Sequence, residues 1–130
     1  MKVTELNAIN AALVDMSGKE GHGLGYEINK NLHLTKKALT DWTDRLNEYK
    51  AEKYIKDESG KPEVFEVDGQ QFNKFKEDET EEINEVFEKF SNESFELPLV
   101  EFDGDKIKEA FLAGKFDGVD LSALYGVLID

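Results

Sequence analysis

Residues 26–56 read YEINKNLHLTKKALTDWTDRLNEYKAEKYIK, a stretch with neither proline nor glycine. Apolar and long side chains recur in it at steps of three and four, the spacing of one helix face: Leu32, Thr35, Leu39, Trp42, Leu46, Tyr49 and Lys53. The pattern predicts one long helix with a seam like that of a coiled coil. At about 1.5 Å per residue it would extend roughly 45 Å, so other elements must pack against it.

The segment before this helix predicts a shorter helix and a loop. Thr4 is a candidate N-cap, and four apolar side chains follow it at helical spacing: Leu6, Ile9, Leu13 and Met16. Residues 18–25 then contain four glycines in eight positions. Because glycine adopts many backbone conformations, this stretch is expected to be an exposed loop.

The segment after the long helix predicts a turn, a hairpin and a third helix. Gly60 and Pro62 break the helix, and the dipeptide Asp68-Gly69 is typical of a type I′ turn between short strands. A third helix is expected from about Gln70 to Phe90, antiparallel to the long one. Its apolar face would consist of Phe72, Phe75, Ile83, Phe87 and Phe90.

The remaining chain predicts an extended segment and two short helices. Residues 95–102 alternate with a period of two, and Pro98 restricts them to an edge strand or a linker. Short helices are expected at 105–113 and at 120–129, the second with an apolar stripe of Leu121, Leu124, Tyr125 and Leu128. The predicted fold is mainly α, a long helical hairpin with a short β excursion and a C-terminal helical cap. We expect a single domain over 1–130, divided into 1–25, 26–56, 57–72 and 73–130.

The net charge of −13 is concentrated in the second half of the chain. Residues 57–130 hold 21 Asp and Glu against seven Lys and Arg. Such a field repels nucleic acid and acidic membranes and favours protein partners with a basic surface. The chain has no cysteine and no apolar run long enough to cross a membrane. A cytoplasmic location is therefore expected, without disulfides.

The end of the long helix carries a resemblance. Residues 49–62 read YKAEKYIKDESGKP, a Tyr- and Lys-rich helix end followed by an acidic Gly-x-Pro break. This stretch, the charged helix after Asp68-Gly69, the segment 95–102 and the closing VDLSALYGVL at 119–128 resemble an uncharacterised family of small acidic helical proteins. Bacteriophages and prophages of Gram-positive bacteria encode that family. The resemblance runs over residues 28–130 and leaves the glycine-rich loop outside it. It implies a phage accessory protein inside a bacterial host cell, with no catalytic residues to transfer.

Residue chemistry predicts a protein without catalysis, metal or cofactor. The chain has two histidines, His22 and His33, and no spacing typical of a zinc site. We interpret His22 as a solvated loop residue. The sequence GHGLG at 21–25 matches neither a dinucleotide fingerprint nor a P-loop. The carboxylates of 103–105 and 117–120 lack the order of a calcium loop and are expected to cap helices.

The acidic third helix is the candidate protein-binding surface. Glu77, Glu81, Glu85 and Glu88 follow one another at steps of four, four and three, so they would form one column. The candidate set is completed by Asp78 and Glu82. One interpretation is a merely solvating face. The other is a surface that imitates a nucleic-acid backbone and inhibits a host defence protein or another nucleic-acid-handling protein.

The seam of the long helix also has two interpretations. It could pack against the third helix and the tail of the same chain. Alternatively, Leu39, Trp42, Leu46 and Tyr49 could pair with a second copy in a two-fold homodimer. The second interpretation belongs to an alternative function, a structural or assembly-linked phage protein such as a virion or tail component or a chaperone.

Overall fold

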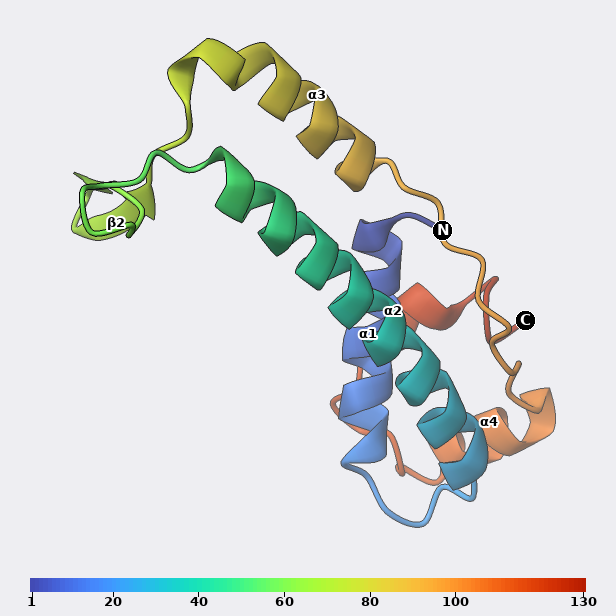
Figure 1. Ribbon diagram of the computed structural model, residues 1–130. Helices are drawn as coiled ribbons and strands as arrows, with labels where there is room; N and C mark the ends of the chain where they lie inside the picture. The colour runs from blue at the N-terminus through green and yellow to red at the C-terminus, as the bar shows by residue number, and fades with distance from the viewer. The chain divides into compact units, whose positions relative to one another are not determined.

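The computed structural model describes residues 1–130 and is mainly helical, with one small antiparallel sheet (Figure 1). The elements in chain order are α1 (Val3–Ser17), α2 (Gly25–Lys53), β1 (Val64–Val67), β2 (Gln70–Asn73), the 3₁₀ turn η1 (Glu77–Glu79), α3 (Thr80–Ser91), α4 (Gly104–Leu112) and the 3₁₀ turn η2 (Ser122–Leu124). The predicted fold class, mainly α with a short β excursion, is confirmed.

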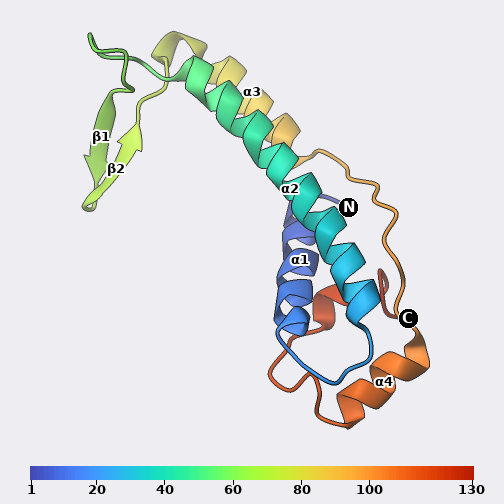
Figure 2. The same ribbon diagram turned by 60° about the horizontal axis from the view of Figure 1, so that its bottom comes forward.

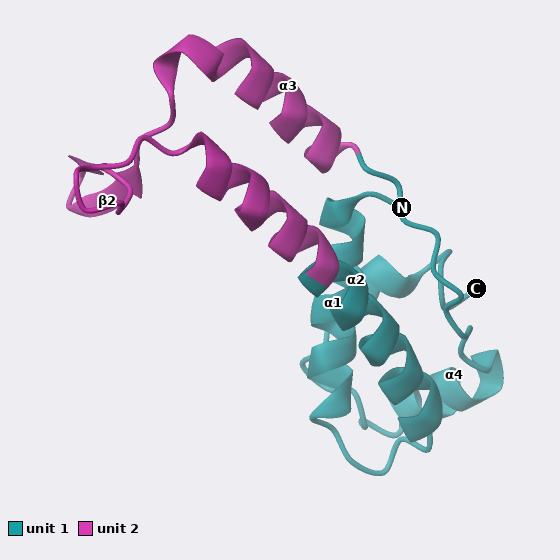
Figure 3. Ribbon diagram, in the orientation of Figure 1, with its two compact units in different colours: residues 1–40, 93–130 teal, residues 41–92 magenta.

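The chain divides into two compact units (Figure 3). Unit 1 consists of residues 1–40 and 93–130, and unit 2 of residues 41–92. The boundary between them falls inside α2, which contributes its first part to unit 1 and its second part to unit 2. The single domain remains a prediction.

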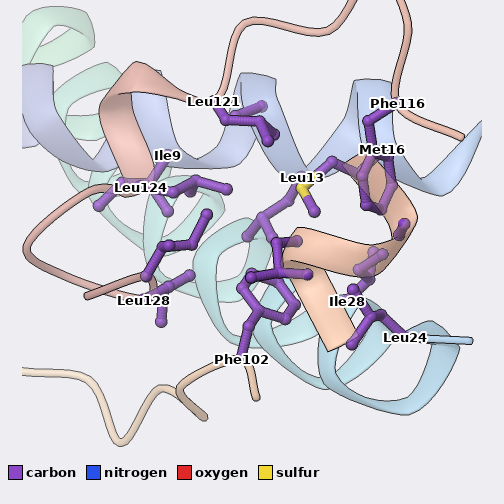
Figure 4. Packing of buried hydrophobic residues seen from close by; sticks show 14 residues of the cluster. Ile9, Leu13, Met16, Leu24, Ile28, Phe102, Phe116, Leu121, Leu124 and Leu128 are labelled. Atoms are coloured by element: carbon purple, nitrogen blue, oxygen red, sulfur yellow. The ribbon is translucent and has the colours of Figure 1, made fainter. Parts of the chain in front are cut away.

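Unit 1 is built on a pair of helices, α1 and the first part of α2, which lie side by side (Figures 1 and 2). The side chains of Thr35 and Asn10 join them, with Thr35 Oγ1 donating to Asn10 Oδ1 at 2.8 Å. Apolar side chains from α1, the loop, α2, α4 and the C-terminal segment form one core (Figure 4). Its largest fully buried members are Phe116, Ile9, Leu13, Met16, Leu24, Ile28, Leu124 and Leu128. Most of the helix-spaced residues of the N-terminal segment are therefore in this core.

A buried asparagine ties the extended segment of unit 1 to α2. Asn31 is fully buried, and its Nδ2 donates to the Val100 carbonyl at 2.7 Å. Its Oδ1 accepts from the Val100 N–H, also at 2.7 Å. The side-chain amide thus satisfies both backbone groups of a residue that no strand pairs. Residues 95–102 form no strand, so the linker interpretation of that segment is confirmed.

Unit 2 contains an antiparallel helical hairpin of α3 and the second part of α2. Trp42 Nε1 donates to the Phe90 carbonyl at 3.0 Å, near the C-terminal end of α3. At the other end, Lys53 Nζ lies 3.1 Å from Glu79 Oε1. The ring of Tyr49 packs between them, 6.2 Å from the ring of Phe87. The prediction that the third helix packs antiparallel to the long helix is therefore confirmed for the second part of α2.

The strands β1 and β2 form the predicted hairpin. They pair antiparallel, with Val67 opposite Gln70 and Phe65 opposite Phe72. The connecting Asp68 and Gly69 have φ values of 51° and 82°. Positive φ at both central residues defines a type I′ turn, whose twist matches that of the strands.

Two predicted helices differ from the structure. The third helix begins at Thr80 and not at Gln70, because the tight turn at 68–69 pairs residues 70–73 with β1. Residues 120–129 form only the turn η2 and further turns, since Gly126 has a φ of 79° and interrupts a helix. Leu121, Leu124 and Leu128 are buried as the stripe predicted, but Tyr125 is exposed.

The helix boundaries differ in smaller ways. The first helix begins at Val3, so Thr4 is not its N-cap, and α4 begins one residue before the predicted helix at 105–113. Asp103 caps α4 by accepting from two backbone N–H groups of its first turn, as expected of that carboxylate. No helix combines the length and the apolar character that a membrane crossing requires.

Candidate functional site

The β hairpin of unit 2 exposes four large apolar side chains. Val64, Phe65, Val67 and Phe72 are each between 43% and 49% exposed. Every residue of β1 and β2 is exposed, so neither face of this sheet is covered. An isolated two-stranded hairpin is only marginally stable, and clustered exposed apolar side chains are typical of interaction surfaces. The hairpin is therefore the first component of the candidate site.

One face of the hairpin continues into a groove. The groove has a volume of about 480 Å³, within the range of about 300–1,000 Å³ for ligand pockets. It is lined by Lys50, Tyr54, Phe65, Phe72, Asn73, Phe75 and Phe87. Five of these are aromatic, contributed by the residue after α2, both strands, the segment after β2 and α3. We call this feature the aromatic groove.

Ring contacts hold the walls of the aromatic groove in place. Phe65 and Phe72 face each other across the strands at 5.7 Å between ring centroids. Phe75 packs against Tyr54 at 4.9 Å and edge-on against Phe87 at 5.6 Å. Such aromatic pairs contribute about 0.5–1.5 kcal/mol each beyond the burial of their area. The groove is a packed feature of unit 2 and not a loose gap.

Backbone hydrogen bonds fix the base of the hairpin to the end of α2. Ile55 donates to the Lys74 carbonyl at 2.9 Å and accepts from the Glu63 N–H at 2.7 Å. Lys74 in turn donates to the Glu63 carbonyl at 2.8 Å. Three chain segments thereby meet in one network, so the hairpin is anchored to α2 at its base.

The turn between α2 and β1 is closed by Asp57. Its Oδ1 accepts from the Ser59 hydroxyl at 2.7 Å, the Ser59 N–H at 2.9 Å and the Lys61 N–H at 3.0 Å. These hydrogen bonds lower the pKa of the Asp57 carboxyl below its ordinary value, and the hydrogen bond from the Ser59 hydroxyl contributes most. The turn is therefore favoured while Asp57 is ionised.

The predicted acidic residues belong to the same unit as this groove and lie on α3 and the turn before it. All six predicted residues are exposed. Glu81, Glu85 and Glu88 share one face of α3, whereas Glu77 and Asp78 belong to η1. Three of the four residues of the predicted column therefore line up along α3, and the fourth, Glu77, lies on the turn before it. We call Glu77, Asp78, Glu81, Glu82, Glu85 and Glu88 the acidic face.

The acidic face is only weakly neutralised by neighbouring cations. Of its six carboxylates, Glu82 alone forms an ion pair, with Lys53 at 3.6 Å. Residues 41–92 contain 16 Asp and Glu against eight Lys and Arg. Unit 2 thus carries a net charge of −8, and the acidic face carries much of it.

A polar cluster lies between α2 and α3. The side chain of Lys53 is largely buried and contacts Glu79 at 3.1 Å. The Tyr49 hydroxyl and Glu79 Oε2 are buried without a hydrogen-bond partner. Burial raises the pKa of the Tyr49 hydroxyl, and the hydrogen bond to Glu79 raises the pKa of the Lys53 ammonium. Both groups therefore hold their protons more tightly in the folded state.

Replacing Tyr49 with phenylalanine should raise the free energy of unfolding of unit 2. A buried donor without an acceptor costs about 1–3 kcal/mol, so its removal should recover about 1 kcal/mol. Because the folded pKa values of Tyr49 and Lys53 are raised, the unfolded chain releases these protons first as pH rises past their ordinary values near 10, and the free energy of unfolding falls above that pH. Y49F should therefore lose less of its free energy of unfolding at alkaline pH than the wild type does.

The sole tryptophan, Trp42, belongs to unit 2 and reports its unfolding in urea by fluorescence. Tyr26→Phe is the matched control, because Tyr26 is exposed in unit 1 and its hydroxyl is free to bind water. A stability loss in Y49F would show that the hydroxyl has a partner and would contradict the expectation.

The predicted self-association residues are used within the chain. Trp42 binds the Phe90 carbonyl, and the Tyr49 ring contacts Phe87 and Phe90. Leu39 and Leu46 are half-buried. The seam is therefore occupied along Trp42 and Tyr49 by contacts to the same chain, and the homodimer remains a prediction.

The sequence pattern does not predict the aromatic groove. It places Phe72 and Phe75 on a helix face, where they would be buried against α2. The available signal was the dipeptide at 68–69, which places Phe65 and Phe72 opposite each other once the register is counted outward from the turn. Among all described residues, no three His, Asp or Glu side chains converge as metal ligands would.

No protein-family model matches this chain, and neither a curated protein nor a solved structure shows significant similarity to it.

Proposed function

We propose that this chain is a non-enzymatic interaction protein that binds a partner protein through unit 2, using the aromatic groove and the acidic face together. The observation that carries the proposal is the exposure of Phe65 and Phe72, which line the aromatic groove on a hairpin with no covered face. Aromatic side chains in a preformed groove are the residue types that dominate binding energy at protein interfaces. The partner would insert apolar side chains into the groove.

The acidic face defines the charge of that partner. It lies on the same unit as the groove, and α3 supplies both Phe87 to the groove and Glu88 to the acidic face. Complementary charge increases the association rate and rejects wrong partners. The partner would therefore present a basic surface next to its apolar one.

The spacing of the acidic face supports a partner that normally holds nucleic acid. Along α3, Glu81 and Glu85 are separated by about 6 Å of helix axis, and Glu85 and Glu88 by about 4.5 Å. One DNA strand carries a phosphate every ~3.4 Å of axis. Both carboxylate spacings agree with the phosphate spacing within a factor of two, so a basic groove for nucleic acid could accept α3 in its place. For a phage accessory protein, which the resemblance implies, the partner would be a host defence protein or another nucleic-acid-handling protein.

The test is affinity capture from a Gram-positive bacterial lysate with the full chain. The variant changes Glu77, Glu81, Glu85 and Glu88 to Gln. The matched control removes four exposed carboxylates of unit 1 and therefore changes the net charge as much as the α3 variant does. Its substitutions are Asp15→Asn, Glu20→Gln, Glu96→Gln and Glu101→Gln. We expect the wild type and the control to retain one partner at low salt and the α3 variant to lose it.

Competition with duplex DNA tests the second part of the proposal. If the partner binds the acidic face in its nucleic-acid groove, excess duplex should release it from the wild type. Equal loss of the partner in both charge variants would indicate an effect of bulk charge and would refute a specific acidic face. Retention in the presence of duplex would refute the imitation of a nucleic-acid backbone.

A further inference from the structure

Unit 1 contains a second cavity, with a basic lining in an otherwise acidic chain. Its volume is about 490 Å³, and it lies between the loop residues 21–23 and the side chains of Lys106, Glu109 and Lys115. Figure 2 shows the loop that joins α1 to α2 at the same end of unit 1 as α4. The cavity thus brings together parts of the chain more than 80 residues apart in sequence.

The histidine of this loop is held in one orientation. His22 Nδ1 accepts from the Leu24 N–H at 3.0 Å. Its ring stacks on the buried ring of Phe116, at 5.2 Å between centroids and 22° between planes. His22 is half-buried, so its interpretation as a solvated loop residue was wrong. Because Nδ1 is an acceptor in this arrangement, the ring hydrogen is on Nε2, which makes that nitrogen a donor.

Two lysines supply positive charge to the cavity. Lys115 lies over Gly21, and its Nζ is 3.3 Å from the place where a β-carbon on Gly21 would be. Lys106 comes from α4. Neither ammonium forms an ion pair, and the one carboxylate of the lining, that of Glu109, forms none either. Two charges that attract an anion are therefore left without a partner.

The loop backbone adds further donors. Gly21 and Gly23 both have positive φ, 76° and 74°, and their N–H groups donate to no acceptor within the chain. Backbone N–H groups in such turns are common anion ligands. The donors come from three parts of the cavity wall: the two lysines, the imidazole and the loop.

We propose that this cavity binds the phosphate group of a small phosphorylated molecule, with Lys106 and Lys115 providing charge and His22 a hydrogen-bond donor. A phosphate has oxygens pointing in several directions and matches donors that converge from different elements. A carboxylate is planar and is matched best by an arginine fork, which this cavity lacks. The volume exceeds that of a bare phosphate and leaves room for an organic substituent.

The test is an NMR titration of the full ¹⁵N-labelled chain at constant ionic strength. The two probes are inorganic phosphate and ribose 5-phosphate, with sodium chloride as the reference. We expect saturable shifts of the amides of Gly21, Gly23 and Lys115. Lys106→Gln and Lys115→Gln should each weaken binding roughly tenfold, because each removes one charge-assisted contact.

Lys108→Gln is the matched control. Lys108 lies on the same helix, and its substitution changes the net charge equally, but its side chain lines a different cavity. The affinity of K108Q for the two phosphate probes should remain within about twofold of that of the wild type. Tighter binding of ribose 5-phosphate than of inorganic phosphate supports the proposed phosphate ester. Equal binding of the two probes would show that the cavity recognises the phosphate group alone and would refute the organic substituent.

Three results would overturn the proposal: no saturable shift in the folded wild type, unchanged binding in both K106Q and K115Q, or an equal loss in K108Q. The spectrum of each variant shows independently whether unit 1 remains folded. The site does not depend on unit 2, so its failure would leave the proposed protein-binding function unaffected.

Discussion

Replacing Asn31 with alanine should lower the free energy of unfolding by about 2–4 kcal/mol. The side chain makes two 2.7 Å hydrogen bonds with the backbone of Val100, and it is fully buried. Alanine removes both bonds and leaves an N–H and a carbonyl of the chain without partners. Alanine also has the higher helix propensity, by about 0.7 kcal/mol, but this gain is smaller than the loss.

Asn29→Ala is the control for that substitution. Asn29 lies on the same helix but is exposed, so the same change should bring only the propensity gain, and the two variants should differ in sign. Urea denaturation followed by far-UV circular dichroism measures both. Asn31→Asp keeps the acceptor for the Val100 N–H but places a carboxylate oxygen against its carbonyl, so it should also destabilise. A loss below about 1 kcal/mol in N31A would show that water replaces the amide.

This contact illustrates what the sequence could not predict. The helix-spaced residues of α1 and of the C-terminal segment were correctly expected to be apolar packing positions, and most are buried. Asn31 is polar and falls outside the predicted seam, and its role depends on a partner 69 residues away. Only the folded chain places the two together, because no local pattern encodes which backbone groups lack a strand.

Local signals competed with one another in the two segments where the prediction was wrong. Residues 70–73 have apolar spacing compatible with a helix, but the Asp68-Gly69 turn is stabilised only if they pair with β1. In the C-terminal segment, Gly126 with positive φ ended the helical pattern, while Leu128 was still buried in the core. In both cases the backbone geometry at a glycine outweighed side-chain periodicity.

The candidate site was predictable in its charge and not in its apolar part. The exposed acidic residues follow from composition and spacing, because charge needs no partner to be placed at the surface. The aromatic groove depends on how strands, α2 and α3 converge on Phe75 and Phe87. Such convergence is a tertiary property, and aromatic residues in sequence are more often expected in a core.

The double substitution Phe65→Thr and Phe72→Thr should reduce affinity for the partner roughly a hundredfold or more. Buried aromatic anchors at interfaces each contribute at least about 2 kcal/mol, which corresponds to more than tenfold. Threonine retains β propensity, so the strands should still pair. The loss of the Phe65–Phe72 ring contact should lower the stability of unit 2 by only about 0.5–1.5 kcal/mol.

Val64→Thr is the matched control, because Val64 is exposed on β1 but does not line the aromatic groove. Its affinity should remain near that of the wild type if the groove face is the one that binds. Titration of the captured partner against the three proteins at fixed salt measures the difference, with Trp42 fluorescence confirming that unit 2 is folded. Salt should weaken the acidic-face contribution and leave the groove contribution largely intact, since apolar burial is not screened. If F65T/F72T binds as the wild type does while the α3 charge variant does not, the acidic face acts alone and the exposed hairpin has another role.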